Sequence, residues 1–89
     1  MKAVVTVVGK DTVGIIAGVC TALAQYNVNV LDISQTVMQG YFTMMMVVEI
    51  SEATIPVAQL AQQMEEVGKK MNLSIRVQRE DIFEAMHRV

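Results

Sequence analysis

Hydrophobic residues alternate with polar residues, or run together as β-branched residues, in four segments of the chain. A period of two residues is that of a β-strand, whose successive side chains point to opposite faces of a sheet. In the second segment this alternation places Leu31, Ile33 and Val37 on one face and polar side chains on the other. The pattern therefore predicts four strands, over residues 2–8, 28–38, 41–50 and 73–79.

Two further segments repeat their apolar residues at the spacing of a helix. The first follows a break at residues 9–14, where Asp11 or Thr12 can cap a helix that runs to about Tyr26. Its apolar face consists of Ile16, Val19, Cys20 and Leu23. The second helix begins at Pro56, because proline suits the first turn of a helix. Its apolar stripe consists of Val57, Leu60, Met64, Val67 and Met71.

Short local patterns predict a turn, ion pairs and one further helix. Gln39-Gly40 predicts a tight turn that joins the second and third strands into a hairpin. Opposite charges four residues apart predict ion pairs on the outer side of the second helix. These pairs are Glu65 with Lys69 and Glu66 with Lys70. Apolar residues near the C-terminus predict a short closing helix over about residues 81–88.

The order strand–helix–strand–strand–helix–strand predicts an α+β fold of the ferredoxin-like kind. We expect a four-stranded antiparallel sheet with two helices on one face, in which the first and third strands are central. Residues 1–89 then form one domain, with a core over about residues 2–80.

The predicted fold leaves more apolar surface than one copy of the chain can bury. The sheet face opposite the helices has an apolar centre, made of Val4, Val8, Met45 and Val47. Its rim is polar and consists of Asp32, Ser34, Thr36, Ser74, Arg76 and Gln78. The first helix offers only Thr21, Gln25 and the Tyr26 phenol as polar side chains. An apolar centre inside a polar rim is typical of an interface, so we expect a homodimer.

Composition narrows the classes of function. Of the 89 residues 53% are hydrophobic, yet no run approaches the roughly 18 apolar residues of a membrane span. The net charge is −2 and the basic residues are scattered, which disfavours nucleic-acid binding. The single cysteine, Cys20, excludes an internal disulfide and suits a reducing, cytoplasmic location.

Groups that could form an active site are not brought together by the pattern. Met44-Met45-Met46 cannot converge on a metal, because neighbouring strand residues point to opposite faces. Residues 9–14 lack the order of glycine and lysine that defines a phosphate loop. Asp32 and Glu49 have no accompanying nucleophile or metal cluster, and His87 is the only histidine. We therefore expect a protein that is not an enzyme and holds no metal or cofactor.

Two short segments resemble the ACT domain family. Residues 9–17, Gly-Lys-Asp-Thr-Val-Gly-Ile-Ile-Ala, resemble its loop between first strand and first helix, where Asp or Asn precedes two residues, Gly and an aliphatic pair. Residues 27–33, Asn-Val-Asn-Val-Leu-Asp-Ile, resemble its segment leading into the second strand. With the element order, the resemblance covers about residues 2–80, and it is closest to small stand-alone ACT proteins and the ACT halves of glycine-cleavage-type regulators. Many members have Arg-Pro where this chain has Thr12-Val13.

The resemblance implies a regulatory module that pairs and binds an amino acid at the interface, between the first loop and the start of the second strand. The ligand-binding residues that it implies are Lys10, Asp11, Thr12, Val13, Gly14, Ile15, Asn29 and Leu31. A helix N-terminus there would offer N–H groups to a carboxylate, and Asp11 or Asn29 could hold an ammonium group. Alternatively, Asp11 is a helix cap and Asn29 only begins a strand.

Two functions stay open. In the first, a homodimer senses an amino acid and acts through a partner, such as a metabolic enzyme or regulator. In the second, the chain is a ligand-free dimerisation or interaction module, which the Thr12-Val13 departure favours. Because the family pairs both edge to edge and face to face, the resemblance leaves open which surface forms the dimer. Neither function involves nucleic acid or a membrane.

Overall fold

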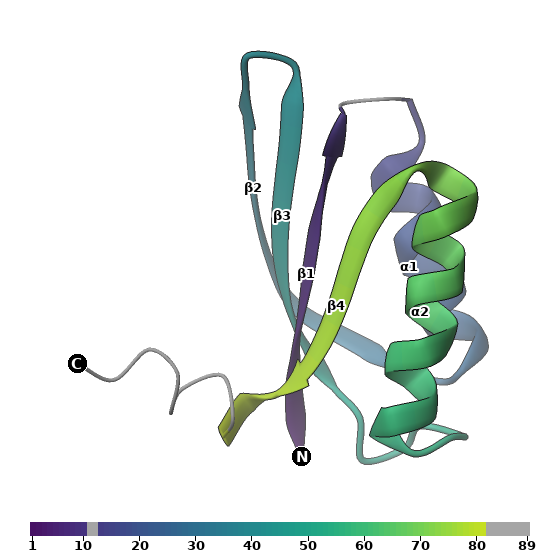
Figure 1. Cartoon of the computed structure of the whole chain (residues 1–89). Coiled ribbons are helices and arrows are strands. Elements are labelled where there is room, and N and C mark those ends of the chain that lie inside the picture. Colours follow the sequence, from purple (N-terminus) through teal and green to yellow (C-terminus); the bar gives the residue numbers. More distant parts are fainter. Residues whose placement is uncertain (11–12, 82–89) are drawn as a thin grey trace.

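The computed structural model describes residues 1–10 and 13–81, which form two layers (Figure 1). The elements in these ranges are β1 (Lys2–Lys10), α1 (Ile15–Gln25), β2 (Asn29–Met38), β3 (Tyr41–Glu49), α2 (Val57–Met71) and β4 (Leu73–Arg79). Both helices lie on the same face of the sheet (Figure 1). The order of elements is the one that the hydrophobic periodicity predicts.

The four strands form one antiparallel sheet in the order β2-β3-β1-β4. β1 and β3 are therefore central, and β2 and β4 are the edges. On the face away from the helices, Val4 of β1 pairs with Val47 of β3 and with Gln78 of β4. These features confirm the predicted ferredoxin-like α+β class.

The core lies between the helices and the sheet, because one face of each central strand is apolar at alternate positions. The largest fully buried side chains are Leu23, Met44, Met46, Leu60, Met64, Val5, Val7, Val19 and Val48. Met44 and Met46 face the core while Met45 lies on the opposite face, as the alternation predicts. Each such buried side chain contributes roughly 1.5–3 kcal/mol of hydrophobic free energy.

α2 and β4 approach each other closely at Gly68. A Cβ atom at this position would lie 2.6 Å from the carbonyl oxygen of Leu73 and 3.1 Å from Cγ1 of Ile75. The first contact is with backbone, which cannot move aside cheaply. A glycine at this point therefore permits the helix to seat directly on the edge strand.

α1 begins later than the sequence analysis predicts. Gly14 is its N-cap residue, with φ of +88°, and no side chain hydrogen-bonds to the cap. A left-handed residue cannot continue a right-handed helix, so the expectation that Asp11 or Thr12 caps the helix is wrong. The first helical bond instead runs from the Gly18 N–H to the Gly14 carbonyl, at 2.8 Å. Asp11 and Thr12 themselves lie outside the described residues.

β2 departs from simple alternation at a bulge between Val30 and Asp32, where Leu31 is the extra residue. Beyond the bulge, Ile33 and Val37 pair with buried residues of β3 and so lie on the helix side. The register therefore supports the predicted common face for these two residues but not for Leu31. At the far end of β2, Gln39 and Gly40 both have positive φ, as the tight hairpin turn requires.

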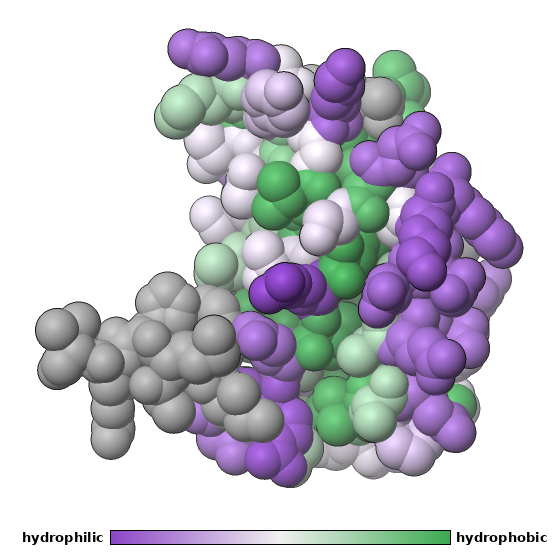
Figure 2. Space-filling model, viewed as in Figure 1, coloured by the Kyte–Doolittle hydropathy of each residue, from purple (hydrophilic) through white to green (hydrophobic). Residues whose placement is uncertain are grey.

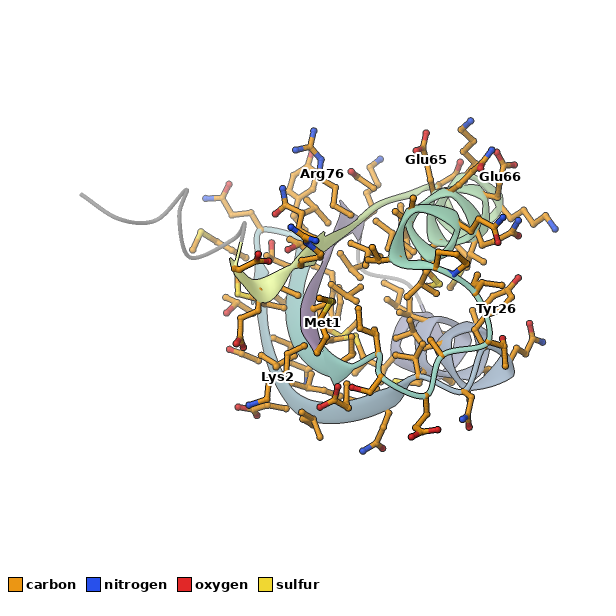
Figure 3. All side chains as sticks on the ribbon, turned by 90° about the horizontal axis from the view of Figure 1, so that it is seen from below. Met1, Lys2, Tyr26, Glu65, Glu66 and Arg76 are labelled. Atoms are coloured by element: carbon orange, nitrogen blue, oxygen red, sulfur yellow. The ribbon has the colours of Figure 1, made fainter. Side chains whose placement is uncertain are left out.

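The outer side of α2 carries its charges, and Glu65 and Glu66 point away from the sheet (Figure 3). Lys69 Nζ lies 3.9 Å from a carboxylate oxygen of Glu65 and 3.7 Å from one of Glu66. The first pair is the predicted one. The second replaces the predicted Glu66–Lys70 pair, because residues three apart on a helix are also neighbours. From residue 82 onward, the predicted C-terminal helix and His87 lie outside the described residues.

Candidate functional site

The loop between β1 and α1 brings several of the candidate ligand residues to one end of the molecule. Lys10 ends β1, is exposed, and pairs with Tyr41 at the start of β3. Val13 is exposed, whereas Ile15 is 3% exposed and anchors the first turn of α1 in the core. The described residues of the loop thus combine a buried anchor with open neighbours.

The N-terminus of α1 follows directly on this loop. Gly14 has no capping side chain, and the first turn of the helix contains no acidic residue. The first backbone N–H groups of a helix lack intrahelical partners and carry partial positive charge. Apart from its chain neighbours, a Cβ atom at Gly14 would meet none of the described atoms within 4 Å.

Asn29 and Leu31 lie toward the opposite end of the sheet. Asn29 pairs with Glu49, which in turn pairs with Lys2, at the end of β1 remote from Lys10. The 11 residues of α1 separate the two ends, a rise of about 16 Å. Asn29 and Leu31 are both exposed. One chain by itself therefore does not bring the two parts of the predicted site together.

The outer edge of the sheet next to Asn29 and Leu31 is uncovered. Leu31, Ile33 and Val37 of β2 are 48%, 40% and 54% exposed, so α1, which contacts β2, leaves these side chains partly uncovered. On the adjacent side of α1, Ile16 is 37% exposed. An edge strand also presents unpaired backbone N–H and C=O groups. β2 and the outer face of α1 together make an apolar surface with open hydrogen-bonding groups, which we call the β2 edge surface.

An ion-pair cluster near Asn29 escaped the sequence analysis. The N-terminal ammonium of Met1 donates to Glu49 Oε2 at 2.8 Å and to Ser51 Oγ at 2.6 Å. Ser51 Oγ also donates to Glu49 Oε2, at 2.7 Å. These hydrogen bonds, that from the ammonium foremost, lower the pKa of Glu49 from 4.5 to about 2. No periodic pattern signals a contact between residues 48 positions apart.

Two hollows among the described residues lie along the junction of α2 and β4. One, of about 370 Å³, is lined by Val57, Ala58, Ala61, Val77, Gln78 and Arg79. A second, of about 380 Å³, lies farther along the same junction. Hydrophobic residues follow this junction beside the hydrophilic outer face of α2 (Figure 2). Neither of these two hollows includes a candidate ligand residue.

Two kinds of feature were sought in the part of the chain that the structure describes, a metal site and a membrane-spanning helix. Across residues 1–10 and 13–81, no group of three or more His, Cys, Asp or Glu side chains could hold a metal ion. Within the same ranges, no helix is long and apolar enough to cross a membrane.

The fold and the β1–α1 loop together define a class of protein. It is a small α+β module with an uncapped helix N-terminus and an unpaired strand edge. The ACT domain family matches residues 2–78 of the chain, and the chain belongs to this family. A UPF0237 protein of Bifidobacterium longum (strain NCC 2705) is 54% identical over 88 residues, covering 99% of this chain and 98% of that protein. The predicted resemblance is thereby confirmed.

Solved structures agree. An ACT domain protein from Streptococcus pneumoniae is 46% identical and superimposes with a TM-score of 0.83, over 94% of each chain. A candidate glycine cleavage system transcriptional repressor superimposes with a TM-score of 0.73 at 22% identity, over 88% of this chain and 44% of that one. At that identity the second likeness shows the fold alone. ACT domains are regulatory ligand-binding modules, and this places the chain in a regulatory class.

Proposed function

We propose that the protein is a homodimeric regulatory module that binds an amino acid between the β1–α1 loop of one subunit and the start of β2 of the other. Its output passes through a partner protein, such as a metabolic enzyme or regulator. The observation that carries the proposal is the separation of the candidate residues. In one chain, Gly14 and Asn29 lie at opposite ends of α1, and a second chain can bring them together.

Pairing of two β2 edges about a two-fold axis supplies the missing half of the site. Such a pairing is antiparallel, so the start of one β2 lies beside the end of the other. The end of β2, at Met38, pairs with Tyr41, which pairs with Lys10. The partner subunit's Asn29 therefore comes to the end of the sheet that holds the β1–α1 loop. The same pairing covers Ile33 and Val37 and satisfies the open edge of the sheet.

The chemistry of this site fits an α-amino acid. Its carboxylate meets the backbone N–H groups around Val13, Gly14 and Ile15, where the helix dipole is positive. Its ammonium group meets Asp11 or the amide oxygen of the partner subunit's Asn29. Its side chain faces the apolar β2 edge surface, where Leu31 is 48% exposed. In this proposal the site binds and does not catalyse, and the half-buried free thiol of Cys20 suits the cytoplasm.

A ligand-free interaction module is the second candidate. It is favoured by Thr12-Val13 in place of Arg-Pro. In that case the β2 edge surface forms the dimer and nothing enters between the subunits.

A thermal-shift screen against the common amino acids separates the two candidates. A ligand that binds only the folded state raises the melting temperature, by an amount set by its concentration over its Kd. The best ligand is then titrated into wild type, Asn29→Ala and Gln62→Ala. Gln62 is an exposed residue of α2, whereas its neighbour Gln63 accepts a hydrogen bond from the Tyr26 hydroxyl. We expect Asn29→Ala to weaken binding by roughly 1–3 kcal/mol, and Gln62→Ala to leave it unchanged.

Light scattering at micromolar concentration tests the pairing itself. A monomer mass for the wild-type protein would exclude the shared site. Equal ligand affinity in wild type and Asn29→Ala would place the ligand elsewhere. An absence of any stabilising amino acid, with dimer mass retained, would favour the interaction module.

A further inference from the structure

β4 is a second edge of the sheet, on the opposite side from the β2 edge surface. Among the described strands, only β1 pairs with β4, so the other side of β4 has no strand beside it. β4 and α2 lie at the front of the view in Figure 1, and β2 lies behind them. An edge strand can extend its sheet by pairing with a segment of another molecule. This edge stays accessible when two β2 edges pair.

A continuous groove runs between the β4 edge and α2, and we call it the β4 groove. A third hollow, of about 280 Å³, lies between the hollows of about 370 and 380 Å³. It shares Ala61 and Val77 with the first of them, and Glu65 and Ile75 with the second. Small or apolar side chains wall one end of the groove, namely Val57, Ala58, Ala61 and Val77. There is thus room beside β4 for side chains that point toward α2.

The two walls of the β4 groove carry opposite charges. Arg76 of β4 and Glu65 of α2 both project on this side of the molecule (Figure 3). Glu65 lies 3.9 Å from Lys69 Nζ, so its charge already has a counterion. Across residues 1–10 and 13–81, no ion pair includes Arg76, which is exposed. The uncompensated charge at this edge is therefore positive.

A second copy of the chain does not complement this edge. Arg76 is the middle residue of β4, which spans Leu73–Arg79. Two β4 strands that paired antiparallel about a two-fold axis would overlap fully only with Arg76 opposite the partner subunit's Arg76. Like charges directly opposite each other destabilise a strand pair. The charge therefore favours a segment that carries acidic side chains.

We propose that an extended acidic segment of a different protein binds the β4 groove by adding a strand to β4. Its side chains alternate between the two faces of the lengthened sheet. Those that point toward α2 are apolar and fill the groove beside Ala58 and Ala61. Those on the other face are acidic and lie beside Arg76. The backbone hydrogen bonds supply affinity, and the alternating side chains supply specificity.

This surface gives the proposed function the place where its partner binds, and it rests on that proposal for the existence of a partner. The docking itself requires neither the amino acid nor the dimer. Leu73 and Ile75 are 8% and 5% exposed, so α2 already covers the core side of β4 and the fold does not need the added strand. A dimer paired through β2 presents two β4 grooves, one at each end of the joined sheet.

A short peptide is the probe for this site. It is as long as β4, seven residues, alternates valine with aspartate, and has blocked ends and a fluorescent label. The full chain is titrated into the peptide and the fluorescence anisotropy is measured. We expect one peptide to bind per chain, and light scattering to show that the dimer persists with peptide bound.

Two control peptides test the chemistry of recognition. One has lysine in place of aspartate, and the other has proline at its central position, which removes a backbone N–H from the added strand. We expect each to bind wild type at least about tenfold more weakly than the aspartate peptide.

Charge reversal at the edge locates the peptide. Arg76→Glu should bind the aspartate peptide about tenfold more weakly and should prefer the lysine peptide. Lys70→Glu is the matched control, because Lys70 is an exposed residue of α2 that lines none of the three hollows. It should bind the aspartate peptide as wild type does.

The outcomes separate this proposal from the proposed function. It is overturned if the aspartate peptide does not bind, if wild type binds it no better than either control peptide, or if R76E and K70E bind it equally. A fall in the assembly mass on adding the peptide would also overturn it, since the peptide would then be replacing a second copy of the chain. If wild type is a monomer that no amino acid stabilises, the proposed function fails, while binding of one aspartate peptide per chain that R76E weakens would still support the β4 site.

Discussion

The α2–β4 half of the molecule buries the strand beneath its helix, whereas the α1–β2 half leaves its strand exposed. Leu73 and Ile75 of β4 are 8% and 5% exposed, and Gly68 lets α2 sit directly against them. In β2, Ile33 and Val37 point to the same side of the sheet but are 40% and 54% exposed. Equal apolar patterning thus has different consequences, according to where the helix lies.

The outer faces of the two helices match this difference. α2 presents Glu65, Glu66 and Lys69 to solvent and needs nothing more to cover it. α1 presents mainly small and apolar side chains, and Ile16 is 37% exposed. The α2–β4 half therefore needs no partner to cover it. The α1–β2 half is covered by another molecule in the proposed dimer.

The largest contrast is expected in the core. Leu60 of α2 is fully buried, so Leu60→Ala should reduce the free energy of unfolding by about 2–5 kcal/mol through a cavity and lost burial. Ile33→Ala in exposed β2 removes a side chain of the same size and should cost less than about 1.5 kcal/mol. Urea unfolding of both variants measures the difference. Similar midpoint shifts would mean that the two halves are equally complete.

Two glycine replacements repeat the comparison at helix–strand and helix–helix contacts. Gly68→Ala places a methyl group 2.6 Å from a backbone oxygen and should destabilise by about 1–3 kcal/mol. Gly18→Ala in α1 meets the Cε atom of Met71 at 2.8 Å, the flexible end of a side chain. There the gain in helix propensity, up to about 1 kcal/mol, should offset the repacking. Thermal unfolding that showed equal losses would contradict this contrast.

The β2 edge surface should control association rather than folding. Val37→Lys is expected to change the free energy of unfolding of the isolated subunit by less than about 0.5 kcal/mol. It should weaken edge pairing by about tenfold or more, since a charge is buried without a partner. Gln62→Lys on the outer side of α2 is the matched control and should leave the assembly mass unchanged. Light scattering over a dilution series distinguishes them.

The smallest effect concerns pH. The pKa of Glu49 is about 2 in the folded protein against an ordinary 4.5, so ionisation of Glu49 stabilises the fold above about pH 4.5. That contribution is lost as the pH falls from 4.5 toward 2, because the carboxylate is then protonated. Glu49→Gln should lose less stability than wild type over this interval in urea titrations at low salt. Parallel pH profiles for the two proteins would show that the ammonium–carboxylate contact is absent in solution.

Much of the fold could be predicted from the spacing of apolar residues and from the residue types at turns. The four strands, the Gln39-Gly40 turn and the stripe of α2 all lie where local pattern predicts them, because the chain alternates or repeats cleanly there. The N-terminal cap of α1 was not predicted correctly. Asp11 and Thr12 are good capping residues, but the left-handed conformation of Gly14 postpones the start of α1 to Ile15. A glycine is compatible with several conformations, so its φ could not be inferred from its identity.

The candidate site was predictable only in part. Motif resemblance pointed to the two candidate segments, but not to their positions relative to each other. Asn29 follows α1 within a few residues in sequence, yet α1 carries it to the other end of the sheet from Lys10. The bulge at Leu31 also left no trace in the alternation, because one extra residue preserves the apolar composition of the strand.

The sequence by itself determined the order of elements, the family and the alternation that separates Met44 and Met46 from Met45. These properties depend on neighbours within a few residues, and local periodicity encodes them. Tertiary structure alone decided which apolar residues become core and which become surface. Ile33 and Ile75 both alternate with polar neighbours in strands, but α2 covers only β4, and Ile33 stays 40% exposed. Burial depends on which elements the folded chain places over each face, and the pattern of a single strand does not contain that information.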